Sequence, residues 1–184
     1  MKYIRTFLIL AIAILSISSI SVSAQTYVSG KAPAAGIERK IFKEIVGLPY
    51  YGAFDHIGYT VNGSTVTLVG KVAVARNKKD AEHAVEDIPG VERVVNNIEI
   101  LPLSPFDNSI RRRIVLAFAN HGGVLSGLLQ EPNPEIRIIV ENGHVSLEGH
   151  VMNRGDYNLA NILANGVSGV FSVQNNLIIG RAQV

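Results

Sequence analysis

The sequence predicts an α+β protein made of two tandem α-β-β-α-β units, each a three-stranded mixed sheet with two helices packed on one face. Three observations support this: an internal repeat, a hairpin signature in each copy, and apolar stripes at helical spacing beside each hairpin. Moving the chain by 79 residues matches it to itself without a gap from about residue 57 to 101, which indicates a duplicated unit. The repeated residues of the first copy are Ile57, Val61, Val66, Leu68, Gly70, Val72, Ala81, Gly90, Val91, Val94, Asn96, Asn97 and Ile100.

The hairpin of the second copy is marked by Asn142-Gly143 between two stretches of alternating apolar residues. Both central residues of such a two-residue turn need a positive φ, which asparagine and glycine tolerate. Counting outward from the turn pairs Val140 with Val145, so one face of the hairpin is apolar. Residues 63–64, Gly-Ser, predict the equivalent turn in the first copy.

Two histidines, His144 and His150, lie on the other face of the second hairpin. They are six residues apart on one strand, roughly 20 Å, which is too wide for a shared metal ion. We therefore expect them to cover a solvated sheet face opposite carboxylates, and we predict no metal site.

A helix follows each hairpin, and Asn77 and Asp156 are its predicted N-caps. A glycine, Gly90 or Gly169, is expected to stop this helix. The predicted buried stripes are Ala81, Ala84, Val85 and Ile88 in the first copy and Ala160, Leu163, Ala164 and Val167 in the second. A helix before each hairpin has apolar residues four apart, at Ile37, Ile41 and Ile45 and at Ile110, Ile114 and Phe118. Packing these stripes over the apolar sheet faces buries both.

A third strand closes each unit and contains a repeated asparagine pair, Asn96-Asn97 and Asn175-Asn176. Because the pair recurs at the same place, we predict a structural hydrogen-bonding role. The aromatic residues Tyr50, Tyr51 and Phe54 are interpreted as a plug beneath the first sheet, with an exposed contact for a membrane or partner as the alternative.

Residues 1–24 are predicted to be a signal peptide, because Lys2 and Arg5 precede an apolar run and small residues end at Ala24. The alternative is an uncleaved membrane anchor. The chain has no cysteine, which excludes a lipid-modified cysteine and disulfides and, with export, predicts a periplasmic location. Residues 25–36 are expected to be a flexible lead-in.

The predicted domains are residues 37–102 and 108–180, joined by a linker at 103–107. Each unit is small, so we expect the two to dock. Residues 107–109 are expected to cap the next helix. Of 17 Lys and Arg residues, Lys2 and Arg5 lie in the leader, leaving 15 basic against 15 acidic residues. This balance disfavours nucleic acid as a partner.

The segments V66-T-L-V-G-K-V72 and G90-V-E-R-V-V-N-N-I98 recur together at residues 145–151 and 169–177. This duplicated pattern resembles the BON domain family over residues 37–102 and 108–180. The resemblance implies an exported, non-enzymatic module without a cofactor. Such a module associates with anionic phospholipids and supports envelope integrity or osmotic stress tolerance, or it binds envelope proteins. The lipoprotein members of the family are anchored through a cysteine, which this chain lacks.

No catalytic motif such as G-x-S-x-G, H-E-x-x-H or a P-loop is present. The second copy carries a longer apolar connection and a cluster of arginines, which we interpret as a peripheral contact with an anionic phospholipid surface. The candidate lipid-binding residues are Arg111, Arg112, Arg113, Val124, Leu125, Leu128, Leu129 and Arg154. Two alternatives stay open: the connection folds back over the core as a short helix, and the arginines are ordinary solvated charges.

Overall fold

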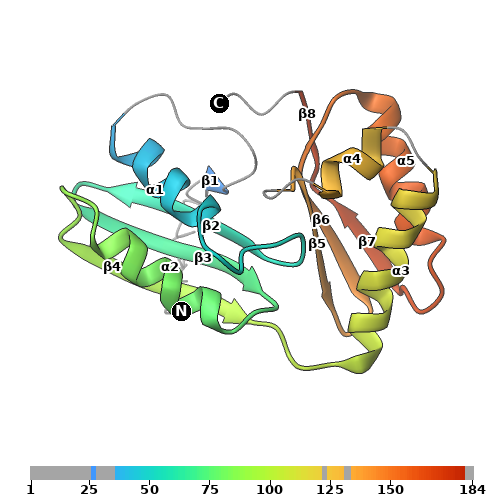
Figure 1. The fold of residues 1–184 in the computed structure, drawn as a ribbon, viewed down its shortest axis with the longest axis horizontal. Coiled ribbons are helices and arrows are strands. Elements are labelled where there is room, and N and C mark those ends of the chain that lie inside the picture. The colour runs from blue at the N-terminus through green and yellow to red at the C-terminus, as the bar shows by residue number, and fades with distance from the viewer. Residues whose placement is uncertain (1–25, 28–35, 122–123, 131–133, 181–184) are drawn as a thin grey trace, which may run out of the picture.

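The protein is seen as a computed structural model that describes residues 26–27, 36–121, 124–130 and 134–180. Two α+β units lie side by side, and the helices of the second unit lie on the side of its sheet away from the first unit (Figure 1). The predicted fold class is therefore confirmed. The predicted leader, residues 1–24, lies outside the described residues.

The first unit has a sheet of order β1-β2-β3-β4, in which β2 and β3 are antiparallel and β3 and β4 are parallel. The short strand β1 pairs with β2 and is part of the segment expected to be a flexible lead-in, so that expectation is wrong for these two residues. The elements are β1 (Thr26–Tyr27), α1 (Ile37–Val46), β2 (His56–Asn62), β3 (Thr65–Val72), α2 (Arg76–Glu86) and β4 (Arg93–Ile100).

The second unit repeats this arrangement, with β5, β6 and β7 in order and β8 also paired with β6. Its third strand is interrupted at residues 176–177, whereas the first unit has one continuous β4. The elements are α3 (Pro105–His121), α4 (Val124–Gln130), β5 (Ile136–Glu141), β6 (His144–Val151), α5 (Arg154–Asn165), β7 (Ser172–Asn175) and β8 (Ile178–Ile179).

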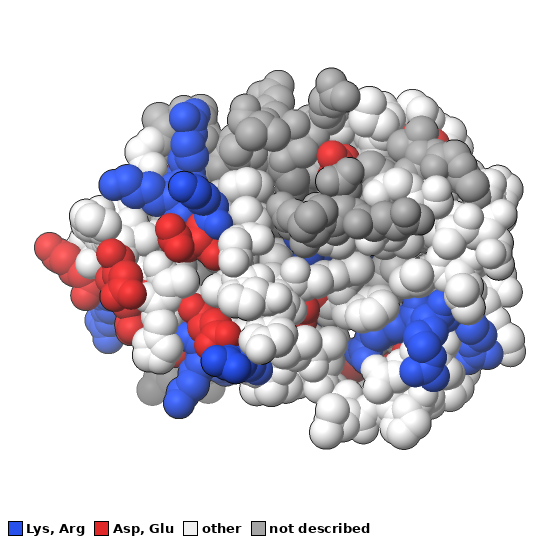
Figure 2. Space-filling view, in the orientation of Figure 1, with Lys and Arg blue, Asp and Glu red and all other residues white. Residues whose placement is uncertain are grey.

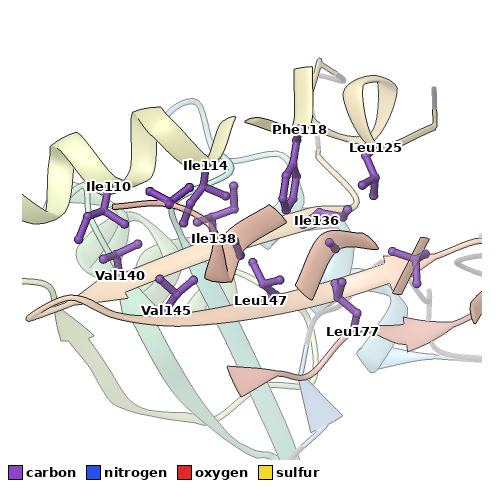
Figure 3. Packing of buried hydrophobic residues seen from close by; sticks show 14 residues of the cluster. Ile110, Ile114, Phe118, Leu125, Ile136, Ile138, Val140, Val145, Leu147 and Leu177 are labelled. Atoms are coloured by element: carbon purple, nitrogen blue, oxygen red, sulfur yellow. The ribbon is translucent and has the colours of Figure 1, made fainter. Parts of the chain in front are cut away.

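Each unit has its own apolar core between its sheet and its helices. In the second unit, Ile110, Ile114 and Phe118 of α3 point onto the apolar face of β5 and β6 and are fully buried (Figure 3). In the first unit, Ile41 and Ile45 of α1 are equally buried. The helical stripes predicted from the spacing of apolar residues are thus confirmed.

The hairpin turn of the second unit has the predicted geometry, with φ of 51° at Asn142 and 79° at Gly143, and Val140 pairs with Val145. The buried carboxylate of Asp107 accepts hydrogen bonds from the amides of Asn142 at 3.0 Å and Gly143 at 2.8 Å. Asp107 therefore ties the beginning of α3 to the hairpin turn instead of capping its own helix.

Several helix boundaries differ from the predictions. Helix α3 begins at Pro105, inside the predicted linker, because the Ser104 hydroxyl accepts a hydrogen bond from the Asp107 amide at 3.1 Å and provides the N-cap. The N-cap of α5 is Asn153, not Asp156, and its side chain accepts from the Asp156 amide. Asn77 is buried inside α2, where its side chain donates to the Tyr50 carbonyl at 2.9 Å.

The repeated glycine of the hairpin's second strand is required by the close approach of the partner strand. A Cβ at Gly70 would lie 2.1 Å from the His56 carbonyl oxygen, and one at Gly149 would lie 1.9 Å from that of Glu135. The φ angles, 120° and 110°, also disfavour any other residue. The glycine of the repeated motif thus shapes the same bend in both sheets.

The two units dock, as expected, where the loop of residues 51–54 in the first unit lies against β5 of the second. The Ile138 amide and the Arg137 guanidinium donate to the carbonyls of Ala53 and Gly52, each at 2.6 Å, and the guanidinium carbon lies 4.2 Å from the centroid of the Tyr51 ring. Phe54 packs against the core of the second unit. The expected plug beneath the first sheet is thus confirmed for Tyr51, which is buried in the first core, and wrong for Tyr50, which is 52% exposed, and for Phe54.

The prediction of a solvated face around both histidines is wrong for His150, which is 2% exposed, whereas His144 is exposed. Arg137 on the neighbouring strand is also buried. The first unit covers this face at Arg137, through Gly52 and Tyr51.

Candidate functional site on the outer face of α3

The outer face of α3 carries apolar and cationic side chains together. Phe106 is 45% exposed and Leu116 is 56% exposed, and Arg112 and Arg113 lie between them in sequence. At 100° per residue these four residues fall within about 120° of the helix circumference. The opposite side of the helix packs on the core. We call these four residues, together with Phe171, the aromatic–arginine patch.

Phe171 joins the patch from the turn that precedes β7. It is 68% exposed, and its ring centroid lies 6.1 Å from that of Phe106. The turn brings Gly169 against the helix, since a Cβ at Gly169 would lie 3.2 Å from the Phe106 ring and 3.6 Å from Nη2 of Arg113. Two exposed aromatic rings and a guanidinium therefore meet at this end of the second unit.

The patch is cationic because no carboxylate in the described part of the chain forms an ion pair with it. Arg113 donates to the Ser109 carbonyl and hydroxyl oxygens at 3.2 and 2.8 Å, both neutral groups. Among the described residues, neither Arg112 nor Arg113 forms an ion pair. The only acidic residue of α3, Asp107, is buried at the hairpin turn. Figure 2 shows the blue atoms gathered over α3 among white ones, whereas red and blue are mixed over α1 and α2.

Arg111, one of the candidate lipid-binding residues, does not lie on this surface. It is 4% exposed, and its guanidinium donates to the Val140 carbonyl at 2.6 Å and to the Asn108 side chain. Burial lowers the pKa of this guanidinium, although the nearby carboxylates of Asp107 and Asp55 oppose that shift. Its inclusion among the surface residues was wrong, because the side chain holds α3 to β5.

The longer apolar connection of the second copy forms α4 and folds back over the core. Leu125 is 1% exposed beside Phe118, and Leu129 packs against the same cluster (Figure 3). The side chains of Val124 and Leu128 lie outside the described residues. For Leu125 and Leu129 the structure thus shows the alternative of a short helix covering the core, rather than insertion into a lipid interface.

Arg154 is not brought to the patch. The turn after the C-terminal end of α5 contacts Phe106 near the beginning of α3, whereas Arg154 begins α5 at its other end. A helix of 12 residues is about 18 Å long. Arg154 instead lies 5.1 Å over the Tyr157 ring. Of the eight candidate residues, the structure therefore places Arg112 and Arg113 together on an exposed surface.

A groove of about 730 Å³ lies on the opposite side of the second sheet, between the two units. It is bordered by His56 and Lys71 of the first unit and by β6 and β7 of the second. Burial, with a smaller contribution from the Arg137 charge, lowers the pKa of His56 to about 3, so its imidazole is neutral. Hydrogen bonding to Glu141 raises the pKa of Lys71. Within the described ranges, no group of three or more His, Cys, Asp or Glu side chains could hold a metal ion.

The asparagine pairs play the predicted structural part through their first member. Asn96 donates to the Lys78 carbonyl at 2.8 Å, and Asn175 donates to the Tyr157 carbonyl at 2.9 Å. These carbonyls are equivalent positions of the two copies, so each last strand is fixed to the helix that follows the hairpin of its unit. The second member of the later pair, Asn176, lines the groove.

Comparison with known proteins identifies the family. The BON domain model matches residues 33–102 and 107–181, so the chain belongs to the BON domain family, with two tandem domains. Membership indicates a non-catalytic module of the cell envelope, periplasmic or associated with a membrane. In the described part of the chain, no helix combines the length and apolar character needed to cross a bilayer.

No curated protein matches the chain. Two solved structures of CdsD, a structural protein of the type III secretion system of Chlamydia trachomatis, show weak similarity. One, of the C-terminal domain, has 12% identity and a TM-score of 0.28, covering 80% of this chain and 98% of that one. The other has 14% identity and a TM-score of 0.27, covering 76% and 90%.

Proposed function

We propose that the protein is a non-enzymatic periplasmic module that binds the surface of anionic phospholipid membranes peripherally, through the aromatic–arginine patch of its second BON domain. The observation that carries the proposal is the outer face of α3, where Phe106 and Leu116 flank two arginines that have no ion-pair partner among the described residues. Guanidinium groups bind lipid phosphates, and aromatic rings favour the headgroup region. This role fits the support of envelope integrity or osmotic stress tolerance implied by the family resemblance.

The two copies offer a matched comparison. The residues of α1 equivalent to Arg112 and Arg113 are Arg39 and Lys40, but α1 also carries Glu38 and Glu44. The charge around α1 is therefore mixed, whereas that on the exposed part of α3 is positive. Attraction to an anionic surface should thus be stronger at the second unit.

The proposal is tested by sedimentation with vesicles of phosphatidylcholine alone or mixed with phosphatidylglycerol. Each cation near an anionic surface contributes about 1 kcal/mol, so the double variant Arg112→Gln/Arg113→Gln should bind about thirtyfold more weakly. The matched double variant Arg39→Gln/Lys40→Gln should keep most of the affinity. Equal losses in the two double variants, or salt-independent binding to both kinds of vesicle, would contradict a specific role of α3.

A second candidate function is the docking of an envelope protein without lipid contact. Strand β4 forms the outer edge of the first sheet over eight residues, and Ile100 on it is 50% exposed. Such an edge can accept a partner's strand through backbone hydrogen bonds. Crosslinking in the periplasm from a photoreactive residue at position 100 tests this candidate, which would be rejected if no protein adduct formed.

A further inference from the structure

The groove between the two units is a second candidate site. It borders the aromatic–arginine patch, because the ring centroid of His144, which lines the groove, lies 5.9 Å from that of Phe171. The groove lies on the sheet face that carries no helix, whereas α3 covers the other face of the same sheet. Its volume of about 730 Å³ falls within the usual range of small-ligand pockets, about 300–1,000 Å³. The floor of the groove is formed by β6 and β7.

A ladder of polar side chains covers this floor. The parallel register places His144 beside Ser172 and Ser146 beside Gln174, and His144 Nδ1 lies 2.7 Å from the Ser172 hydroxyl. One step further, the Asn176 amide donates to the Glu148 carboxylate at 2.7 Å. The ladder thus offers hydrogen-bond donors and acceptors in alternation along two strands.

Two polar residues of the ladder belong to the second copy alone. At the repeat offset of 79 residues, the equivalent of Glu148 is Val69 and that of Gln174 is Val95. The first copy therefore lacks the carboxylate and the amide at these positions. The polar residues occur in the copy whose sheet forms the floor of the groove.

The charges of the groove disfavour an anionic ligand. The Lys71 ammonium forms ion pairs with Glu141 and, at 3.4 Å, with Glu99, so its charge is compensated. Glu148 is hydrogen-bonded by the neutral groups of Ser146 and Asn176 and forms no ion pair among the described residues. A phosphate or carboxylate ligand would meet this carboxylate, and Lys71, the only lysine or arginine among the described residues that line the groove, is already ion-paired.

We propose that the groove binds a neutral oligosaccharide. Amide, hydroxyl and carboxylate groups can bond sugar hydroxyls without requiring a net charge on the ligand. The apolar side chains of Ile139 and Ile178 also line the groove and offer contact for the apolar faces of sugar rings. Gln174 is exposed and makes no side-chain hydrogen bond among the described residues, so its amide is available to a ligand.

The test uses protein expressed from the full-length sequence, labelled with ¹⁵N and titrated with chitotetraose, maltotetraose or penta-alanine. The proposal expects saturable amide shifts at Ser146, Gln174 and Asn176 with at least one of the two sugars. Loss of one neutral hydrogen bond in Gln174→Ala should weaken that binding about fivefold, and loss of the charge in Glu148→Gln about tenfold. The control Asn97→Ala alters the equivalent of Asn176 in the first copy and should leave the affinity unchanged.

Two results would overturn the proposal. One is the absence of saturable shifts in the groove with both sugars. The other is a shift of the same three amides by penta-alanine at lower concentration than by either sugar, which would assign the groove to a peptide. Vesicle binding is measured separately, and Gln174→Ala leaves the aromatic–arginine patch intact, so failure here does not affect the membrane proposal.

Discussion

Acidification should destabilise the docked arrangement of the two units through His56. This imidazole is 4% exposed between the sheets, and its pKa in the folded protein is about 3, compared with 6.5 for a free histidine. Because the unfolded chain takes up the proton first, stability is lost as the pH falls below about 6.5 and continues to fall until about 3. Between pH 6.5 and pH 5 the free energy of unfolding falls by about 1.4 kcal/mol per pH unit over about 1.5 units. The protein at pH 5 should therefore be about 2 kcal/mol less stable than at pH 7.5.

The assay is urea unfolding at pH 7.5 and pH 5 for the wild type and for His56→Gln. The difference between the two pH values should be about 2 kcal/mol smaller in the variant, because glutamine does not titrate. The control His83→Gln alters a histidine that is 69% exposed on α2 and should retain the wild-type pH dependence. An unchanged pH dependence in His56→Gln would refute the reasoning and place the imidazole in water, with the sheets apart.

Three further substitutions test how the second unit is held together. Asp107→Ala removes the acceptor of two turn amides and should cost about 3 kcal/mol in urea unfolding, whereas a loss under about 1 kcal/mol would show that water replaces the carboxylate. Gly149→Ala places a Cβ against the Glu135 carbonyl at a positive φ and should cost at least about 3 kcal/mol in thermal unfolding. A Cβ at Gly127 in α4 would have no atom within 4 Å, so Gly127→Ala should stabilise the protein by about 0.5–1 kcal/mol. Equal effects of the two alanine substitutions would contradict the claim that the bend in β6 requires glycine.

Turn residues and the spacing of apolar residues predicted most of the fold. The Asn142-Gly143 turn sets the hairpin register by itself, since its geometry determines which residues face each other. The spacing of Ile110, Ile114 and Phe118 likewise defined the buried side of α3. Because the sequence is duplicated, the hairpin and helices predicted for one copy were also predicted for the other.

Features that depend on contacts distant in sequence were not predicted. His150 and Arg137 lie on a strand face that the sequence predicts to be exposed, yet both are buried, and the first unit contacts Arg137. Asp107 resembles a helix cap, yet its partners are 35 and 36 residues away in the hairpin turn. Periodicity carries no information about either contact.

The candidate site was predicted in part. Helical spacing showed that three consecutive arginines cannot share one face, and Arg111 could have been recognised as the inward one, because it precedes Ile114 by three residues and Phe118 by seven. Phe106 and Phe171 were missed. They are 65 positions apart in the sequence, and the turn at Gly169 brings them together.

The most direct test of the membrane proposal is the fluorescence of a single tryptophan in the patch. The chain has no tryptophan, so Phe171→Trp introduces one fluorophore, and Tyr50→Trp places a matched one at a 52% exposed aromatic position of the first unit. The proposal predicts a blue shift of the emission from position 171 with phosphatidylglycerol vesicles, reversed by salt, and little change at position 50. Emission from position 171 that stays unchanged with these vesicles, or shifts equal to those at position 50, would contradict it.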